Sequence, residues 1–218
     1  KRLLLLNEKR KLIENSILKE AVEQAVAQSQ NNIIIVKGNL WHNGVLGIVA
    51  SRLVEKFNKP AIVISFHNSF GQGSARSIKN IDLGNTILNA KKEGLLIAGG
   101  GHKMAAGLKV STKLIKKFED YLIKKFNNYD QLFFRKIHYY DLILTLEQVN
   151  LNLIENIQKM EPFGKGNHEP KFIIKEVIVE HIKIIKEKHI LVFLRDNFNN
   201  SFKAICFNCV NNELGENF

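Results

Sequence analysis

Cysteine is scarce in this sequence, which contains only Cys206 and Cys209, separated by two residues. A zinc site needs further ligands at suitable spacing, and a thioredoxin-like C-x-x-C should open a helix. The run FKAICFNC over residues 202–209 instead predicts a strand. We therefore expect neither metal binding nor redox chemistry from this pair. Few cysteines and no apparent secretory signal favour a cytoplasmic protein.

Long hydrophobic runs are also missing. No apolar stretch approaches the roughly 18 residues that a bilayer-spanning helix requires, so no membrane partner is expected. Methionine occurs only at Met104 and Met160 and the first residue is Lys1, which predicts that the sequence is a piece of a longer protein. The 218 residues, 45% of them hydrophobic, suffice for one large globular domain or two small ones.

Acidic residues are few in the first part of the chain. The whole sequence has 32 Lys and Arg against 21 Asp and Glu, a net charge of +11. Residues 1–127 hold 21 of the basic and only 9 of the acidic residues, whereas residues 128–218 hold 11 and 12. This uneven excess favours a polyanionic partner, nucleic acid before an acidic membrane surface. The alternative is solubility charge on solvated faces.

The apolar spacing divides the chain into three parts. Residues 1–30 predict a linker helix. From residue 7 onward this segment contains no Gly or Pro, and Ile13, Ile17 and Ala21 recur at four-residue spacing. Residues 31–127 predict a compact α/β domain. Its expected strands are 33–36, 61–66, 70–77 and 108–110, and its expected helices are 45–57, 82–90 and 112–126, the last capped by Ser111.

Residues 128–218 predict a second, β-rich domain. A strand over 137–146 and a helix over 147–160 precede a Pro- and Gly-rich loop at 162–170. Three β-rich runs follow, at 172–185, 189–195 and 201–207. Consecutive antiparallel strands in a small domain indicate a curled sheet or barrel, of which an OB-like fold is our first choice.

The segment GGGHKMAAG over residues 99–107 is the most informative of the chain. Successive glycines without side chains let a ligand approach the backbone, and their N–H groups can form a concave nest for a phosphate or carboxylate oxygen. His102 follows these glycines and could add a directed hydrogen bond. The alternative is a tight turn in which glycine serves only backbone geometry.

Two further segments suit an anion. In GQGSARS, over residues 71–77, Ser74 and Arg76 lie two apart on a predicted strand and therefore share one face. In WHNG, the residues from Trp41 to Gly44 precede a predicted helix, whose N-terminus carries unpaired N–H groups. Trp41 itself is expected to anchor the loop in the core. The sequence has no Asp and His cluster with the spacing of a two-metal site, so we expect binding and no catalytic or metal-binding residue in this chain.

Four segments follow one another along the chain: WHNGVLGIVASR at 41–52, GQGSARS at 71–77, GGHKMAAG at 100–107 and MEPFGKGNHEPKF at 160–172. In this order they resemble the RecJ family of DHH-superfamily phosphoesterases, which are single-strand-specific 5′→3′ DNA exonucleases. The first three resemble the family's DHHA1 domain and the fourth the segment leading into its OB-like domain. The family usually has proline at His168 and glycine at Ala75, and neither difference removes a ligand group.

The resemblance implies an α/β DHHA1-like domain followed by a β-rich OB-like domain, preceded by a long linker helix. It implies that Ser74, Arg76 and His102 hold phosphates of single-stranded DNA. Two divalent ions, Mn or Mg, are expected in a DHH domain upstream of this sequence. The remaining implied binding residues are Gly100 and Gly101, which give backbone access, His42 in the same cleft, and Lys165, with Phe163 as either a stacking group or a core anchor.

Two other functions remain open. A DHH-family oligoribonuclease or small-nucleotide phosphodiesterase would share the glycine–histidine segment but would not need the second β-rich domain. A non-catalytic single-stranded nucleic-acid-binding module would need neither the linker helix nor a further domain. An Asp-His-His motif in the natural sequence before Lys1 would decide between these functions and a RecJ-type exonuclease.

Overall fold

The computed structural model of the chain describes residues 2–210 and 215. It divides into two compact units, Lys1–Lys136 and Ile137–Phe218. No helix among the described residues is both long enough and apolar enough to span a membrane.

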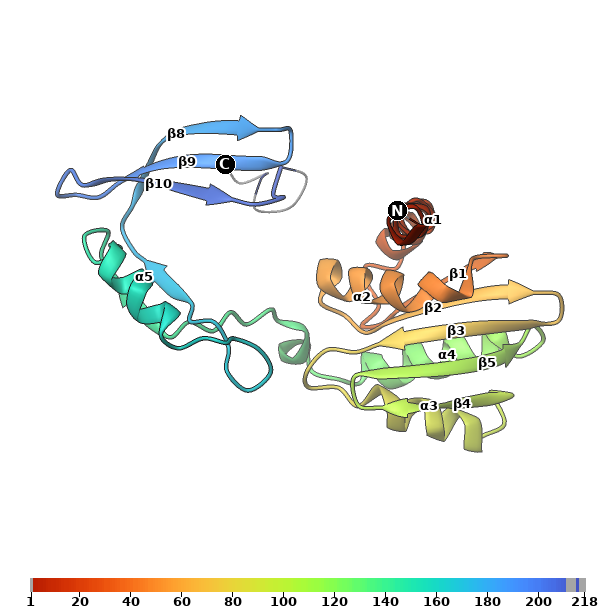
Figure 1. Cartoon of the computed structure of the whole chain (residues 1–218). Helices are drawn as coiled ribbons and strands as arrows, with labels where there is room; N and C mark the ends of the chain where they lie inside the picture. Colours follow the sequence, from red (N-terminus) through yellow and green to blue (C-terminus); the bar gives the residue numbers. More distant parts are fainter. Residues whose placement is uncertain (1, 211–214, 216–218) are drawn as a thin grey trace. The chain divides into compact units, whose positions relative to one another are not determined.

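The first unit is built on one five-stranded sheet with the strand order β1-β2-β3-β5-β4 (Figure 1). β1 and β2 are parallel, and all other neighbours are antiparallel. The two-residue turn Lys103–Met104 joins β4 to β5. The strands are β1 (Ile34–Asn39), β2 (Ala61–His67), β3 (Phe70–Arg76), β4 (Ala98–His102) and β5 (Ala105–Ser111).

Helices lie on both faces of this sheet (Figure 1). On one face, α1 (Arg2–Val26) and α2 (Leu46–Phe57) bury an apolar cluster against β1 and β2. On the other face, α3 (Leu83–Lys92) and α4 (Ile115–Asn127) bury a second cluster that extends under β3 and β5. The continuous apolar run of β2 follows from this arrangement, since its alternate residues enter the two clusters.

The second unit has short elements and a small core. β6 (Leu142–Leu144) pairs in parallel with β7 (Phe172–Ile174), and α5 (Leu151–Gln158) lies between them in sequence. β8 (Ile178–Ile185), β9 (His189–Arg195) and β10 (Ser201–Cys206) form an antiparallel sheet. Ile190, Val192 and Cys209 are the buried centre of this sheet.

Several sequence expectations need correction. The glycine–histidine segment is not a nest: Gly99 to His102 form the extended edge strand β4, which pairs antiparallel with β5 along its length. The α-helix expected from 112 begins at Ile115, and the Ser111 hydroxyl accepts only from the Lys113 N–H (3.3 Å) in the preceding turn. The strand expected over 172–185 is interrupted between β7 and β8, and that expected over 137–146 is only the three residues of β6.

Candidate nucleic-acid interface

The strand register brings Ser74, Arg76, Gly100 and His102 to one face of the sheet, whereas Gly101 lies on the other face and His42 lies outside the strands. Arg76 on β3 pairs with Ala105 on β5, which pairs with His102 on β4. In the next row Ser74 pairs with Gly107, which pairs with Gly100. Directly paired residues in antiparallel strands share a face. We call the surface formed by Ser74, Arg76, Gly100, His102 and Gly107 the glycine face.

The floor of the glycine face is open. A methyl group added at Gly100 or at Gly107 would meet no other atom within 4 Å. Gly101 differs, because it pairs with the buried Ala106 and belongs to the opposite face of the sheet. A Cβ at Gly101 would collide with the carbonyl oxygen of Ala105. Gly100 and Gly107 therefore leave room for a ligand, whereas Gly101 leaves room for the strand pairing.

Arg76 is held beside Ser74 at the edge of this floor. Its Nη1 donates to the Ser74 hydroxyl at 3.3 Å and to the Ala75 carbonyl at 2.9 Å. The guanidinium lies against Gly47 on α2, where an added Cβ would be 2.9 Å from Nη2 and 3.2 Å from the Ser74 Oγ. The glycine face is thus on the same side of the sheet as α2. Sequence reasoning missed this role of Gly47, which stands in the quoted segment 41–52.

His102 ends β4 and is exposed beside the turn to β5. Its Nδ1 accepts a long hydrogen bond of 3.4 Å from the Met104 N–H. Its backbone is fixed from below by α3, because Gly84 lies so close that a Cβ there would be 2.7 Å from the His102 carbonyl. Gly84 is a second supporting residue that the sequence analysis did not identify. A glycine in the first turn of a helix, where alanine would be favoured, was the available signal.

The loop before α2 borders the glycine face through Asn43, whose Nδ2 donates to Gln72 on β3 at 3.3 Å. His42 is exposed and caps the short 3-10 helix Asn43–Val45, with its Nδ1 accepting from the Gly44 N–H at 3.1 Å. Trp41 is buried, and its Nε1 donates to Glu20 on α1 at 3.2 Å. The predicted core role of Trp41 agrees with this position.

Lys165, the remaining predicted binding residue, is exposed in the loop between α5 and β7 of the second unit. Asn167 shapes this loop, since its Nδ2 donates to the carbonyls of Met160 (2.8 Å) and Pro162 (3.1 Å). Phe163 beside it is half-buried. Among residues 2–210 and 215, no three His, Cys, Asp or Glu side chains gather closely enough to hold a metal ion.

The chain is therefore a two-domain protein: its first unit carries the sheet with the open glycine floor, and its second unit is small and β-rich. Residues 30–128 match the family model of the DHHA1 domain, and residues 140–217 match that of the RecJ OB domain. The two matches together define the particular family: this chain belongs to the RecJ family. The fold class predicted from the sequence is thereby confirmed.

Relatives of known name are RecJ exonucleases. The chain is 29% identical over 218 residues to the single-stranded-DNA-specific exonuclease RecJ of Bacillus subtilis, covering 97% of this chain and 27% of that protein. It is 28% identical over 192 residues to the RecJ of Thermus thermophilus, covering 87% and 27%. The chain thus spans about a quarter of the length of these relatives.

Solved structures of Thermus thermophilus RecJ are similar in fold. The complex with Mg²⁺ has a TM-score of 0.72 at 26% identity, covering 88% of this chain and 29% of that one. The complex with Mn²⁺ has a TM-score of 0.74 at 25% identity, covering 88% and 28%.

Proposed function

We propose that the glycine face binds the sugar-phosphate backbone of single-stranded DNA, and that the whole protein is a single-stranded-DNA-specific 5′→3′ exonuclease. The observation that carries this proposal is the convergence of Ser74, Arg76 and His102 around a floor on which Gly100 and Gly107 present no side chain. The names of the relatives support the choice of single-stranded DNA as the substrate.

The chemistry of these groups suits a phosphodiester. The Arg76 guanidinium offers forked donors to phosphate oxygens, and the Ser74 hydroxyl beside it can donate a further hydrogen bond. The bare backbone at Gly100 admits the strand to close range. These groups bind and orient a phosphate. Divalent Mg²⁺ or Mn²⁺, held by residues outside this chain, would supply the activation of water.

The second unit offers a surface for the bases. His181 on β8, Phe193 on β9 and Lys203 on β10 are paired in one row across the three strands. The His181 and Phe193 ring centroids lie 5.6 Å apart, and the Lys203 Nζ lies 5.6 Å from the Phe193 ring. An aromatic ring beside a cation suits base stacking and a phosphate contact in single strands. We propose that this row and Lys165 also contact the single strand. Of the second unit, the sequence analysis identified only Lys165 and Phe163.

Substitutions at the glycine face test the proposal. Arg76→Ala and His102→Ala should each weaken binding of a fluorescent oligothymidylate by about 1–3 kcal/mol, the usual loss for a charge-assisted hydrogen bond. The double variant should lose less than the sum, because residues that share one ligand group are not independent. Arg135→Ala is the matched control, because Arg135 is an exposed arginine of the same unit outside the glycine face.

Two measurements separate binding from folding. Each variant should keep the melting temperature of the parent protein, because His102 is exposed and Arg76 is only half-buried. Removing one phosphate interaction should reduce the slope of log K against log salt by about 0.7. In the whole protein the same variants should slow cleavage, since a loosely held phosphate is poorly positioned. An unstable His102→Ala protein with unchanged affinity would show that the residue is structural and defeat the proposal.

A further inference from the structure

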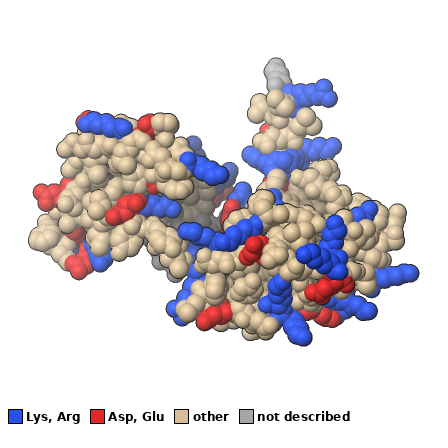
Figure 2. Space-filling model, turned by 90° about the horizontal axis from the view of Figure 1, so that it is seen from below, with Lys and Arg blue, Asp and Glu red and all other residues tan. Residues whose placement is uncertain are grey.

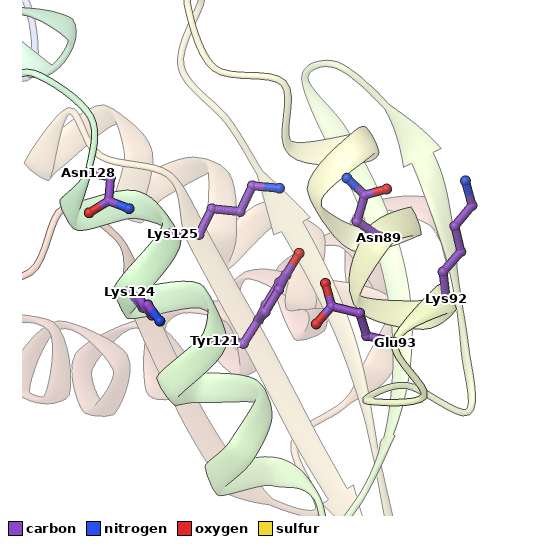
Figure 3. Close-up of a pocket in the computed structure, with 7 residues that line it drawn as sticks. All are labelled: Asn89, Lys92, Glu93, Tyr121, Lys124, Lys125 and Asn128. Atoms are coloured by element: carbon purple, nitrogen blue, oxygen red, sulfur yellow. The ribbon is translucent and has the colours of Figure 1, made fainter.

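A second site lies on the other face of the sheet, between α3 and α4. It is a pocket of about 590 Å³ (Figure 3). Because α3 and α4 pack on the face opposite α2, this pocket is separate from the glycine face. Its size is within the range of small-molecule sites. The residues that line it are Asn89, Lys92, Glu93, Tyr121, Lys124, Lys125 and Asn128.

The pocket has an excess of positive charge. Each helix has a pair of lysines in its last turn, Lys91 and Lys92 on α3 and Lys124 and Lys125 on α4. Lysine in a last turn complements the negative end of the helix dipole, which accounts for one such pair on each helix. The dipole does not explain why lysines of two different helices line the same pocket, as Lys92, Lys124 and Lys125 do. Figure 2 shows basic side chains spread over the face of the first unit that is seen from below.

The acidic residues of α4 do not neutralise these lysines. Asp120 pairs with Lys116 at 3.0 Å, and Glu119 pairs with Lys37 of β1 at 2.6 Å. In the part of the chain that the structure describes, Lys92, Lys124 and Lys125 have no ion-pair partner. Their ammonium groups are therefore available to an anion.

Tyr121 and Glu93 give the pocket a different character from a bare lysine patch. The Tyr121 side chain extends from α4 across the pocket toward Glu93 at the end of α3 (Figure 3). Lys125 places its Nζ 5.8 Å from the centre of the Tyr121 ring. Burial, and then the charge of Glu93, raise the pKa of Tyr121, so its hydroxyl stays protonated and can donate a hydrogen bond. The pocket thus combines cations, an aromatic ring and one carboxylate acceptor.

We propose that this α3–α4 pocket binds a nucleoside monophosphate. Lys125, which extends from α4 over the pocket, would bind the phosphate, and the Tyr121 ring would contact the base (Figure 3). Glu93 and Asn89 can accept hydrogen bonds from sugar hydroxyl or base amino groups. Glu93 disfavours a purely anionic ligand, because a carboxylate repels a phosphate that brings no donor of its own. The inference does not depend on the function of the glycine face.

Binding can be measured by calorimetry and by amide chemical-shift mapping. Thymidine 5′-monophosphate should bind more tightly than either thymidine or inorganic phosphate, and should shift amides of α3 and α4. The variant Lys125→Gln should lose about tenfold or more in affinity, since a charge-assisted contact is removed. Lys116→Gln is the matched control, because Lys116 is an exposed lysine of α4 outside the pocket and already pairs with Asp120.

Three results would overturn the inference. The first is no binding of the nucleotide at millimolar concentration, and the second is an affinity that Lys125→Gln leaves unchanged. The third is inorganic phosphate binding as tightly as the nucleotide, which would reduce the pocket to a simple anion contact. Arg76→Ala distinguishes the two proposals: it should weaken binding of the oligonucleotide and leave the mononucleotide-induced amide shifts of α3 and α4 unchanged.

Discussion

The side chain of Gln28 makes both backbone hydrogen bonds of Ile35 on the edge strand β1. Its Nε2 donates to the Ile35 carbonyl at 2.8 Å, and its Oε1 accepts from the Ile35 N–H at 3.1 Å. One turn earlier on α1, Gln24 does the same for Lys37, at 2.8 and 3.0 Å. The two glutamines take the place of a neighbouring strand and satisfy groups that an open sheet edge would expose.

Removing one of these amides should destabilise the first unit. Gln28→Ala leaves a half-buried N–H and a carbonyl without partners, so we expect a loss of about 1–3 kcal/mol in the free energy of unfolding. Gln30→Ala, at an exposed glutamine just after α1, should change it by less than about 0.5 kcal/mol. Urea denaturation followed by the fluorescence of the single Trp41 measures both. Equal stabilities would contradict the role of Gln28 at the edge.

The glycines of the glycine–histidine segment should respond differently to alanine. Gly100→Ala and Gly107→Ala place a methyl in open space, so the fold should persist while the affinity for single-stranded DNA falls. Gly101→Ala would push a methyl into the Ala105 carbonyl, so it should lower the melting temperature. Thermal melts beside DNA titrations separate these outcomes. If Gly100→Ala and Gly107→Ala bound DNA normally, a ligand would not approach this floor.

Cys206 should be unreactive near neutral pH. A hydrogen bond with the Cys209 side chain, followed by burial, raises the pKa of Cys206 from 9.0 to about 11. Since the native pKa lies above that of the unfolded chain, this contribution to stability is complete below pH 9 and is lost as the pH rises through about 11. The pH–rate profile of alkylation by iodoacetamide should report the native pKa. In Cys209→Ala the profile should move toward 9; an unshifted profile would exclude Cys209 as the cause.

This chain on its own should not degrade DNA. The described residues provide no cluster of three metal ligands, and the proposed role of Arg76 and His102 is to hold the strand. Incubation with 5′-labelled single-stranded DNA and Mn²⁺ should release no mononucleotide, whereas the whole protein should release it. Metal-dependent digestion by a pure preparation of this chain would contradict our placement of the metal-binding groups outside it.

Much of the first unit could be predicted because its signals are local. The β-branched run from Ala61 and the helix ending at Phe57 depend on the apolar spacing of neighbouring residues, and both have nearly the expected bounds. The proximity of Ser74 and Arg76 follows from the two-residue period of a strand. The second unit was harder: its short strands bury few residues, so the interruption after Ile174 left no clear sequence signal.

The sequence by itself determined the order of most elements, the shared face of Ser74 and Arg76, and the segments by which the RecJ family is identified. Only the tertiary structure decided that the glycines form an edge strand, because pairing with β5 competes with the nest geometry that the same residues could adopt. The tertiary structure alone also brought Gly107, Gly47 and Gly84 to the site. These residues come from β5, α2 and α3, and local periodicity carries no information on which elements pack together.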